Sequence, residues 1–179
     1  MQPVSPVGLS GILMASLALA IPLSAQTASV ADPDDVSSID AIMTAVYDVI
    51  SGPAEEPRDW DRFRSLFWPG AQLIPTFRNQ GGDVVANRMS VEEFVTSASG
   101  GFAINPFFEI EAGRVAERYG NIAHIFSTYE SRRDPEQAPF VRGINSFQLM
   151  FDDSRWWVVN IFWTDERLAG PIPPQYLQN

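Results

Sequence analysis

The sequence contains no cysteine and no lysine, and its single histidine is His124. Without cysteine there is no disulfide framework, no thiol chemistry and no lipoprotein attachment site. A metal site would need nitrogen or sulfur ligands that the chain largely lacks, or a carboxylate cluster, so we expect no bound metal. No glycine-rich loop lies between a strand and a helix, which is where a phosphate cradle would be needed. We therefore expect no cofactor.

Positive charge is also scarce in this chain. Twelve basic residues, all arginine, face 22 acidic residues, and the formal net charge is -10. Such a balance repels nucleic acid phosphates and anionic membrane surfaces. We predict no nucleic acid partner.

The first 28 residues are predicted to be a signal peptide. Residues 7–23, "VGLSGILMASLALAIPL", form an uncharged apolar run, and the small residues of "SAQTASV" follow it. A retained membrane anchor is the alternative because the run approaches spanning length. The signal peptide predicts a secreted or periplasmic protein of bacterial type, without stable membrane association after cleavage. Residues 29–37 are then a linker.

Residues 38–168 are predicted to form one α+β domain. The stretch "IDAIMTAVYDVI" has apolar residues at helical spacing, Asp59 can cap a short second helix, and Ser90 with Glu93 forms a capping box for a third. The segments "GAQLIPTFR" and "DVVANR" predict a hairpin at the sheet edge, where Pro75 is tolerated. Strands follow at about 107–117, 122–133, 142–151 and 156–164. Residues 169–179 form a proline-rich tail.

Both faces of the predicted antiparallel sheet are apolar. If "DDSR" is a turn, Phe151 faces Trp156 and Phe147 faces Asn160 across the strand pair. With this pairing, the alternating side chains place apolar residues on both faces of the sheet. Three helices can cover only one face, and a second copy packing on the other predicts a homodimer. The alternative is that the first helix or the C-terminal tail covers this face.

The order of elements, with "DWDRFRSLFWPGAQLI" and "RWWVV", resembles the SnoaL-like and ketosteroid-isomerase-like proteins of the nuclear transport factor two superfamily. The resemblance implies a conical barrel of helices and a curved sheet, also called a cystatin-like α+β roll. It implies a hydrophobic pocket for a small apolar or amphipathic organic molecule. The carboxylate that ketosteroid isomerases carry after the second helix is absent, since Leu73, Ile74 and Pro75 stand there.

His124 is the candidate general base, because imidazole titrates near neutral pH. With "RYGN" as a turn, Val115 opposes His124 and Glu111 opposes Thr128, which places His124 and Glu111 on one face. Tyr47 stands roughly where the resemblance implies an oxyanion-hole tyrosine. The alternative is that His124 makes a structural hydrogen bond on an outward face.

Six further residues are candidates for the pocket wall because they are aromatic or polar and lie on or beside the predicted core. The mid-strand amide of Asn160 needs a partner, and the guanidinium of Arg142 could clamp a carboxylate. These candidates are Trp60, Phe126, Tyr129, Arg142, Asn160 and Phe162. The leading hypothesis is a small-molecule-binding protein. The alternatives are a cofactor-free isomerase, dehydratase or hydrolase using His124, and a non-catalytic dimeric interaction module.

Overall fold

The computed structural model describes residues 30–177, so the predicted signal peptide lies outside the described residues. Five α-helices, seven strands and one 3-10 helix follow one another along this part of the chain. They are α1 (Pro33–Val36), α2 (Ile39–Ile50), α3 (Trp60–Ser65), β1 (Phe67–Arg78), β2 (Val84–Ala86), β3 (Met89–Ser90), α4 (Val91–Ile104), β4 (Phe108–Tyr119), β5 (Ile122–Arg132), β6 (Val141–Phe151), β7 (Trp156–Asp165), α5 (Glu166–Ala169) and η1 (Pro174–Tyr176).

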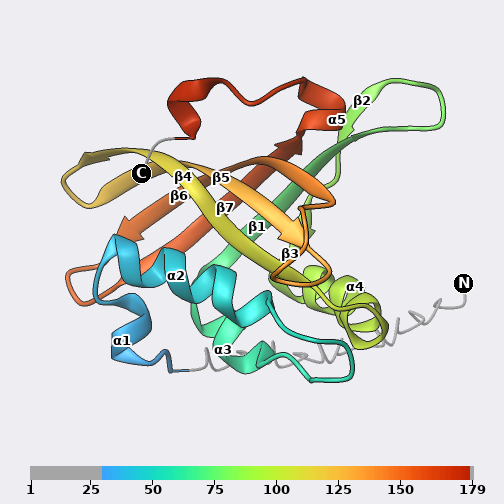
Figure 1. Cartoon of the computed structure of the whole chain (residues 1–179). Coiled ribbons are helices and arrows are strands. Elements are labelled where there is room, and N and C mark those ends of the chain that lie inside the picture. The colour runs from blue at the N-terminus through green and yellow to red at the C-terminus, as the bar shows by residue number, and fades with distance from the viewer. Residues whose placement is uncertain (1–29, 178–179) are drawn as a thin grey trace, which may run out of the picture.

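The strands form one curved sheet in the order β2-β1-β7-β6-β5-β4, with β3 paired to β1 (Figure 1). The predicted α+β architecture is confirmed, but the sheet is mixed, because β1 runs parallel to β7. The prediction of an edge position for Pro75 is wrong, since it pairs with Trp163 inside the sheet. Pro75 is tolerated because it lies between the short pairings that β1 makes with β2 and β3.

The helix starts follow the local sequence signals. Ser38 caps α2, Asp59 caps α3, and Ser90 with Glu93 completes the capping box of α4. The third helix is longer than expected, because it continues through Ile104 instead of ending near residue 95. The predicted linker is also partly helical, since α1 lies within it and Val36 is buried.

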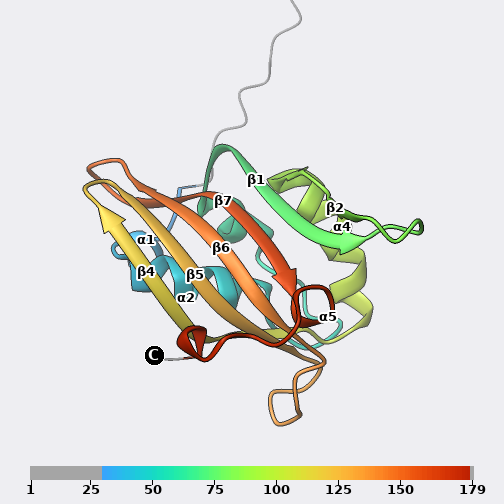
Figure 2. The ribbon, with the colours of Figure 1, turned by 90° about the horizontal axis from the view of Figure 1, so that it is seen from above.

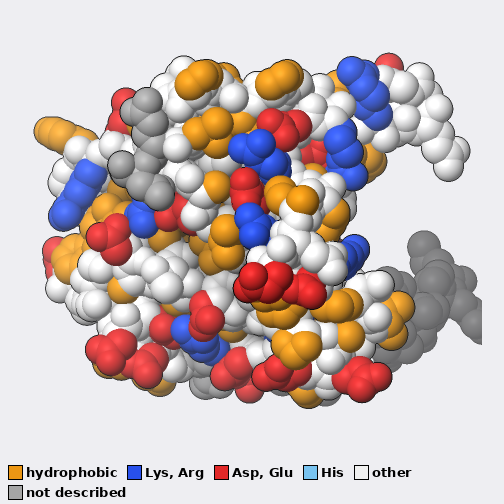
Figure 3. Space-filling model, viewed as in Figure 1, with side chains coloured by type: hydrophobic (Ala, Val, Ile, Leu, Met, Phe, Trp, Pro, Cys, Tyr) orange, Lys and Arg blue, Asp and Glu red, His pale blue; other side chains and the backbone are white. Residues whose placement is uncertain are grey.

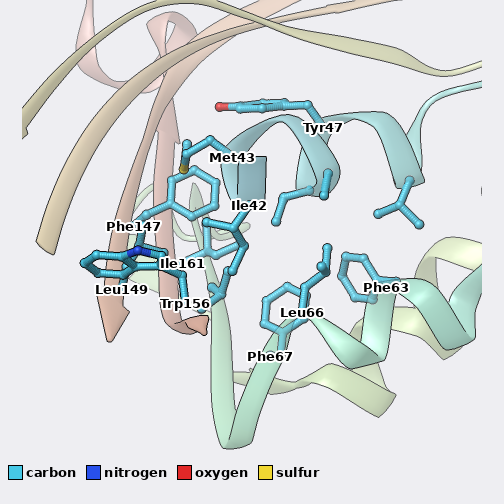
Figure 4. Packing of buried hydrophobic residues seen from close by; sticks show 14 of the residues in the cluster. Ile42, Met43, Tyr47, Phe63, Leu66, Phe67, Phe147, Leu149, Trp156 and Ile161 are labelled. Atoms are coloured by element: carbon cyan, nitrogen blue, oxygen red, sulfur yellow. The ribbon is translucent and has the colours of Figure 1, made fainter. Parts of the chain in front are cut away.

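The core lies between the concave face of the sheet and α2. Ile42 and Met43 of α2 are fully buried and point toward Phe147 and Ile161 of the sheet, while Phe63, Leu66 and Phe67 lie below α2 (Figure 4). Burying side chains of this size contributes about 1.5–3 kcal/mol each relative to exposure. The amphipathic α2 therefore fixes the position of Tyr47, one turn after Met43, above the concave face.

Two β-bulges and one tight turn decide which side chains face the core. The turn between β4 and β5 has two residues, because Tyr119 pairs with Ile122, and Gly120 adopts a φ of 57°. His124 consequently pairs with Glu117, and the predicted pairing with Val115 is wrong.

The first bulge follows Glu111, where Ala112 is the extra residue of β4. It shifts the pairing by one position, so that Glu111 opposes Tyr129 and Glu109 opposes Ser131. Because a one-residue shift exchanges the faces of a strand, both glutamates lie on the concave side. The prediction that they share a face with His124 is wrong.

The second bulge lies between β6 and β7, where Val159 is the extra residue. The predicted pair of Phe151 with Trp156 is confirmed, but beyond the bulge Phe147 pairs with Ile161 instead of Asn160. Asn160 then turns to the convex side, opposite Gln148.

The C-terminal segment packs on the convex face of the sheet, opposite the helices (Figure 2). Thr128 donates a hydrogen bond to the carbonyl of Tyr176 at 2.5 Å, and the rings of Phe126 and Tyr176 lie 5.2 Å apart. The tail therefore covers part of the second apolar face, as the alternative to a dimer proposed. Among residues 30–177, no helix has the length and apolar character of a membrane span.

Candidate functional site

A cavity of about 250 Å³ lies between the concave face of the sheet and helices α2, α3 and α4. Its wall is mainly apolar, with a polar group on the sheet side and a charged pair from the end of β7. The lining residues are Val46, Tyr47, Ile50, Phe63, Leu73, Phe94, Phe102, Phe107, Glu109, Tyr129, Ser131, Val141, Asn145, Phe147, Ile161, Trp163, Asp165 and Arg167.

The helical wall of this cavity is a set of contacting aromatic rings. Phe94 and Phe102 are eight residues apart in α4, which places them on one face of that helix. Phe63 of α3 stacks on Phe94 with ring centroids 5.3 Å apart, and Phe102 stacks on Phe107 at 4.6 Å. Stacked ring pairs of this kind contribute about 0.5–1.5 kcal/mol each beyond the area that they bury.

Glu109 of β4 is the central polar residue of the cavity. Its carboxylate accepts a hydrogen bond from the Ser131 hydroxyl at 2.6 Å and a long one from the Asn145 amide at 3.5 Å. Burial raises the pKa of Glu109 to about 7, although the bonds from Ser131 and Asn145 oppose the shift. Glu109 can therefore hold or release a proton near neutral pH.

Tyr47 lies in a chain of hydrogen bonds between two carboxylates. The chain runs from Glu109 through Asn145, Tyr47 and Ser127 to Glu111. Ser127 uses its one proton to donate to Glu111 at 2.5 Å, so it accepts from the Tyr47 hydroxyl at 2.7 Å. Asn145 donates to the Tyr47 oxygen at 3.1 Å. Burial, with the nearby Glu109 charge, raises the pKa of Tyr47 and keeps its hydroxyl neutral.

Tyr129 provides a second hydroxyl to the cavity wall. Its ring lies against the backbone of β6 at Gly143, where an added Cβ would be 2.6 Å from the Tyr129 hydroxyl oxygen. Burial and the neighbouring carboxylates Glu109 and Asp165 raise the pKa of Tyr129. The phenol is therefore a neutral hydrogen-bonding group at any physiological pH.

An ion pair lies at the β7 end of the cavity. Asp165 caps α5 and accepts hydrogen bonds from the guanidinium of Arg167. Arg167 lowers the pKa of the Asp165 carboxyl, and this carboxyl therefore stays ionised. The pair leaves little net charge at this end of the cavity.

Of the predicted catalytic residues, only Tyr47 lines the cavity. Glu111 lies one step behind it, bonded to Ser127 and paired with Arg114 at 2.9 Å. His124 lies on the convex face, where its Nε2 is 3.0 Å from the Ser146 hydroxyl and its ring contacts Phe126. The two sheet faces thus separate His124 from Tyr47 and Glu111.

The predicted pocket residues are likewise divided between the cavity side and the convex side of the sheet. Tyr129 lines the cavity, whereas Trp60 packs behind its wall, stacked on Phe102 at 6.1 Å. Arg142 lies on the convex side and pairs with Glu130 at 3.2 Å. Phe126, Asn160 and Phe162 also face the convex side. Phe126 and Phe162 line a second hollow there, of about 400 Å³, beneath the C-terminal segment.

The residues that the sequence prediction missed are Glu109 as the cavity carboxylate, Asn145 and Ser131. The argument used for Asn160, that a mid-strand amide needs a partner, applies equally to Asn145. Ser131 carries no such signal, because a serine near a strand end is usual at a surface.

The residues 30–177 contain no group of three or more histidine, aspartate or glutamate side chains that could hold a metal ion. Acidic side chains gather instead on the surface around the helices, along the lower edge of the view in Figure 3. These exposed carboxylates attract cations in general, without the geometry of a metal site.

Comparisons with known proteins place the fold. No protein-family model matches the chain, and no curated protein sequence matches it. The Kfla4162 protein from Kribbella flavida superposes with a TM-score of 0.52 at 14% identity, covering 72% of this chain and 88% of that protein. An NTF2-like protein of unknown function from Silicibacter pomeroyi has a TM-score of 0.49 at 14% identity, covering 72% and 93%. The chain thus shares its overall α+β fold with the Kribbella flavida protein.

Proposed function

We propose that this protein binds a small, largely apolar organic molecule in the cavity beneath α2. The observation that carries the proposal is one carboxylate without an arginine partner, Glu109, in a wall built mainly from aromatic and aliphatic side chains. An apolar cavity with a few convergent polar groups is the usual form of a small-molecule site.

Binding takes precedence over catalysis in this proposal. The Tyr47 hydroxyl already donates to Ser127, so it is not a free donor toward a substrate oxygen. His124, the candidate base, faces away from the cavity. Glu109 could transfer a proton near neutral pH, but the Tyr129 hydroxyl in the same wall is a poor acid partner, because its pKa is raised by burial.

Filling the cavity tests this proposal. Val141 lines the cavity from β6, and we expect Val141→Phe to weaken binding of small apolar compounds at least tenfold because the added ring occupies their space. Binding is measured by calorimetry with a panel of aromatic compounds. The control is Val115→Phe, because Val115 is exposed on the convex face. Equal binding by both variants would contradict the proposal.

We further propose that the protein is a homodimer through the convex face. The C-terminal segment leaves part of this face uncovered, since Val115, Ile122 and Phe162 remain 39%, 56% and 43% exposed. Exposed apolar side chains grouped on one face favour association with a matching surface.

Replacing Ile122 with glutamate is expected to convert the dimer into a monomer. A charge within an apolar interface costs several kcal/mol of association free energy because it loses water without gaining a partner. Light scattering at micromolar concentration measures the mass. Ile104→Glu, on an exposed position of α4, is the control and should stay dimeric. A monomeric unmodified protein would refute the dimer.

A further inference from the structure

The two carboxylates that line the cavity differ in how their charge is balanced. Asp165 is paired with Arg167, which leaves that end nearly neutral. Among the described residues, the Glu109 carboxylate accepts hydrogen bonds only from the neutral Ser131 and Asn145, and no arginine pairs with it. When Glu109 is ionised, the cavity therefore carries one uncompensated negative charge in an apolar environment.

The aromatic lining favours the same sign of ligand charge. The faces of phenylalanine, tyrosine and tryptophan rings carry negative electrostatic potential, and a desolvated cation over such a ring gains about 0.5–2 kcal/mol. The phenylalanine rings of the helical wall stack on one another in pairs, whereas Tyr129 and Trp163 on the sheet side stack on no other ring among the described residues. An anionic group would meet both these rings and the Glu109 carboxylate unfavourably.

We propose that the ligand of this cavity is an organic cation, an amine or quaternary ammonium with an apolar body, whose positive nitrogen pairs with Glu109. This inference rests on the proposed function of the cavity as a small-molecule site. The ammonium supplies the missing counter-charge, while the apolar body fills the space between the aromatic rings. Cations of this kind are bound in proteins by aromatic cages for the same electrostatic reason.

Pairing of the ligand cation with Glu109 is expected to be linked to the release of a proton, which can be measured. The ionisable groups around Glu109 are Tyr47 from α2, Glu111 on its own strand, Tyr129 from β5, Asp165 with Arg167 beyond them, and Asp48 and Arg132 across a hollow on its other side. Both phenols stay neutral and Asp165 stays ionised near pH 7, because burial raises the pKa of each tyrosine and Arg167 lowers the pKa of Asp165. A bound cation favours ionised Glu109, so binding below pH 7 must release a proton.

A matched pair of probes tests the inference by calorimetry. Benzyltrimethylammonium and its uncharged carbon analogue neopentylbenzene have nearly the same shape and differ in one positive charge. We expect the cation to bind at least tenfold more tightly at pH 8. We also expect its affinity to fall as the pH drops below about 7, with proton release seen as a heat that depends on the buffer.

The Glu109→Gln variant is the decisive control. Glutamine keeps the shape and still accepts the hydrogen bond from Ser131, so the neutral probe should bind as before and the preference for the cation should disappear. Equal binding of the two probes by the unmodified protein would overturn the inference and leave the proposed function standing. Binding of neither probe at millimolar concentration would overturn both.

Discussion

Replacing Glu109 with glutamine is expected to stabilise the protein at pH 8 by up to about 3 kcal/mol, and to leave stability near pH 4 almost unchanged. Burial raises the pKa of Glu109 from 4.5 to about 7 in the folded protein. Between these values the folded state holds a proton that the unfolded state has released. The free energy of unfolding therefore falls as the pH rises from about 4.5 to 7, and is constant above.

Urea denaturation at several pH values between 4 and 8 measures this effect. The unmodified protein should lose stability across the interval, while Glu109→Gln should lose much less. Glu117→Gln is the matched control, because Glu117 lies on the same strand with an exposed side chain. Parallel pH profiles for the protein and its Glu109→Gln variant would contradict the prediction. A destabilising carboxylate in a binding cavity is common where function requires it.

Replacing Arg58 with alanine is expected to destabilise the protein by about 3–5 kcal/mol, because several hydrogen bonds from one charged donor group are lost together. Arg58 is only 8% exposed and donates hydrogen bonds to the carbonyls of Ile50, Gly52, Pro53 and Glu56. Its guanidinium thereby holds together the loop that joins α2 to α3. Alanine would leave these carbonyls without their donors.

Chemical denaturation measures the loss, and Arg88→Ala is the control because the Arg88 side chain is exposed. Arg58→Lys should lie between the protein and the alanine variant, since an ammonium group cannot reach all four carbonyls with the geometry of the guanidinium. A loss below about 1 kcal/mol for Arg58→Ala would refute the assignment.

Arg58 supports the aromatic wall of the cavity as well as the stability of the fold. The Arg58 guanidinium lies 5.7 Å from the centroid of the Phe102 ring, which forms part of the cavity wall. The Gly52 backbone pairs with Phe107, the next ring of that wall. Loss of Arg58 is therefore expected to loosen the aromatic wall as well as the loop.

Much of the secondary structure follows from local sequence. The caps at Asp59 and Ser90 occur where the sequence predicts them, because capping depends on residues within one turn of the helix. The meander strands and the pairing of Phe151 with Trp156 also agree with the sequence prediction. These features require only short-range interactions and alternation along a strand.

The site depends on features that the local sequence does not mark. The extra residues Ala112 and Val159 each shift the pairing by one position. These shifts turn Glu109 toward the cavity and Asn160 away from it. The parallel pairing of β1 with β7 likewise joins segments far apart in the chain.

The sequence by itself therefore determined the elements, their order and the apolar character of both sheet faces. Only the tertiary structure decided that Glu109 and Asn145 face the cavity, and that His124 bonds to Ser146 on the other side. The physical reason is the two-residue period of a strand, in which a single bulged residue exchanges the inner and outer faces. Where that residue lies is set by packing of the whole sheet against its helices.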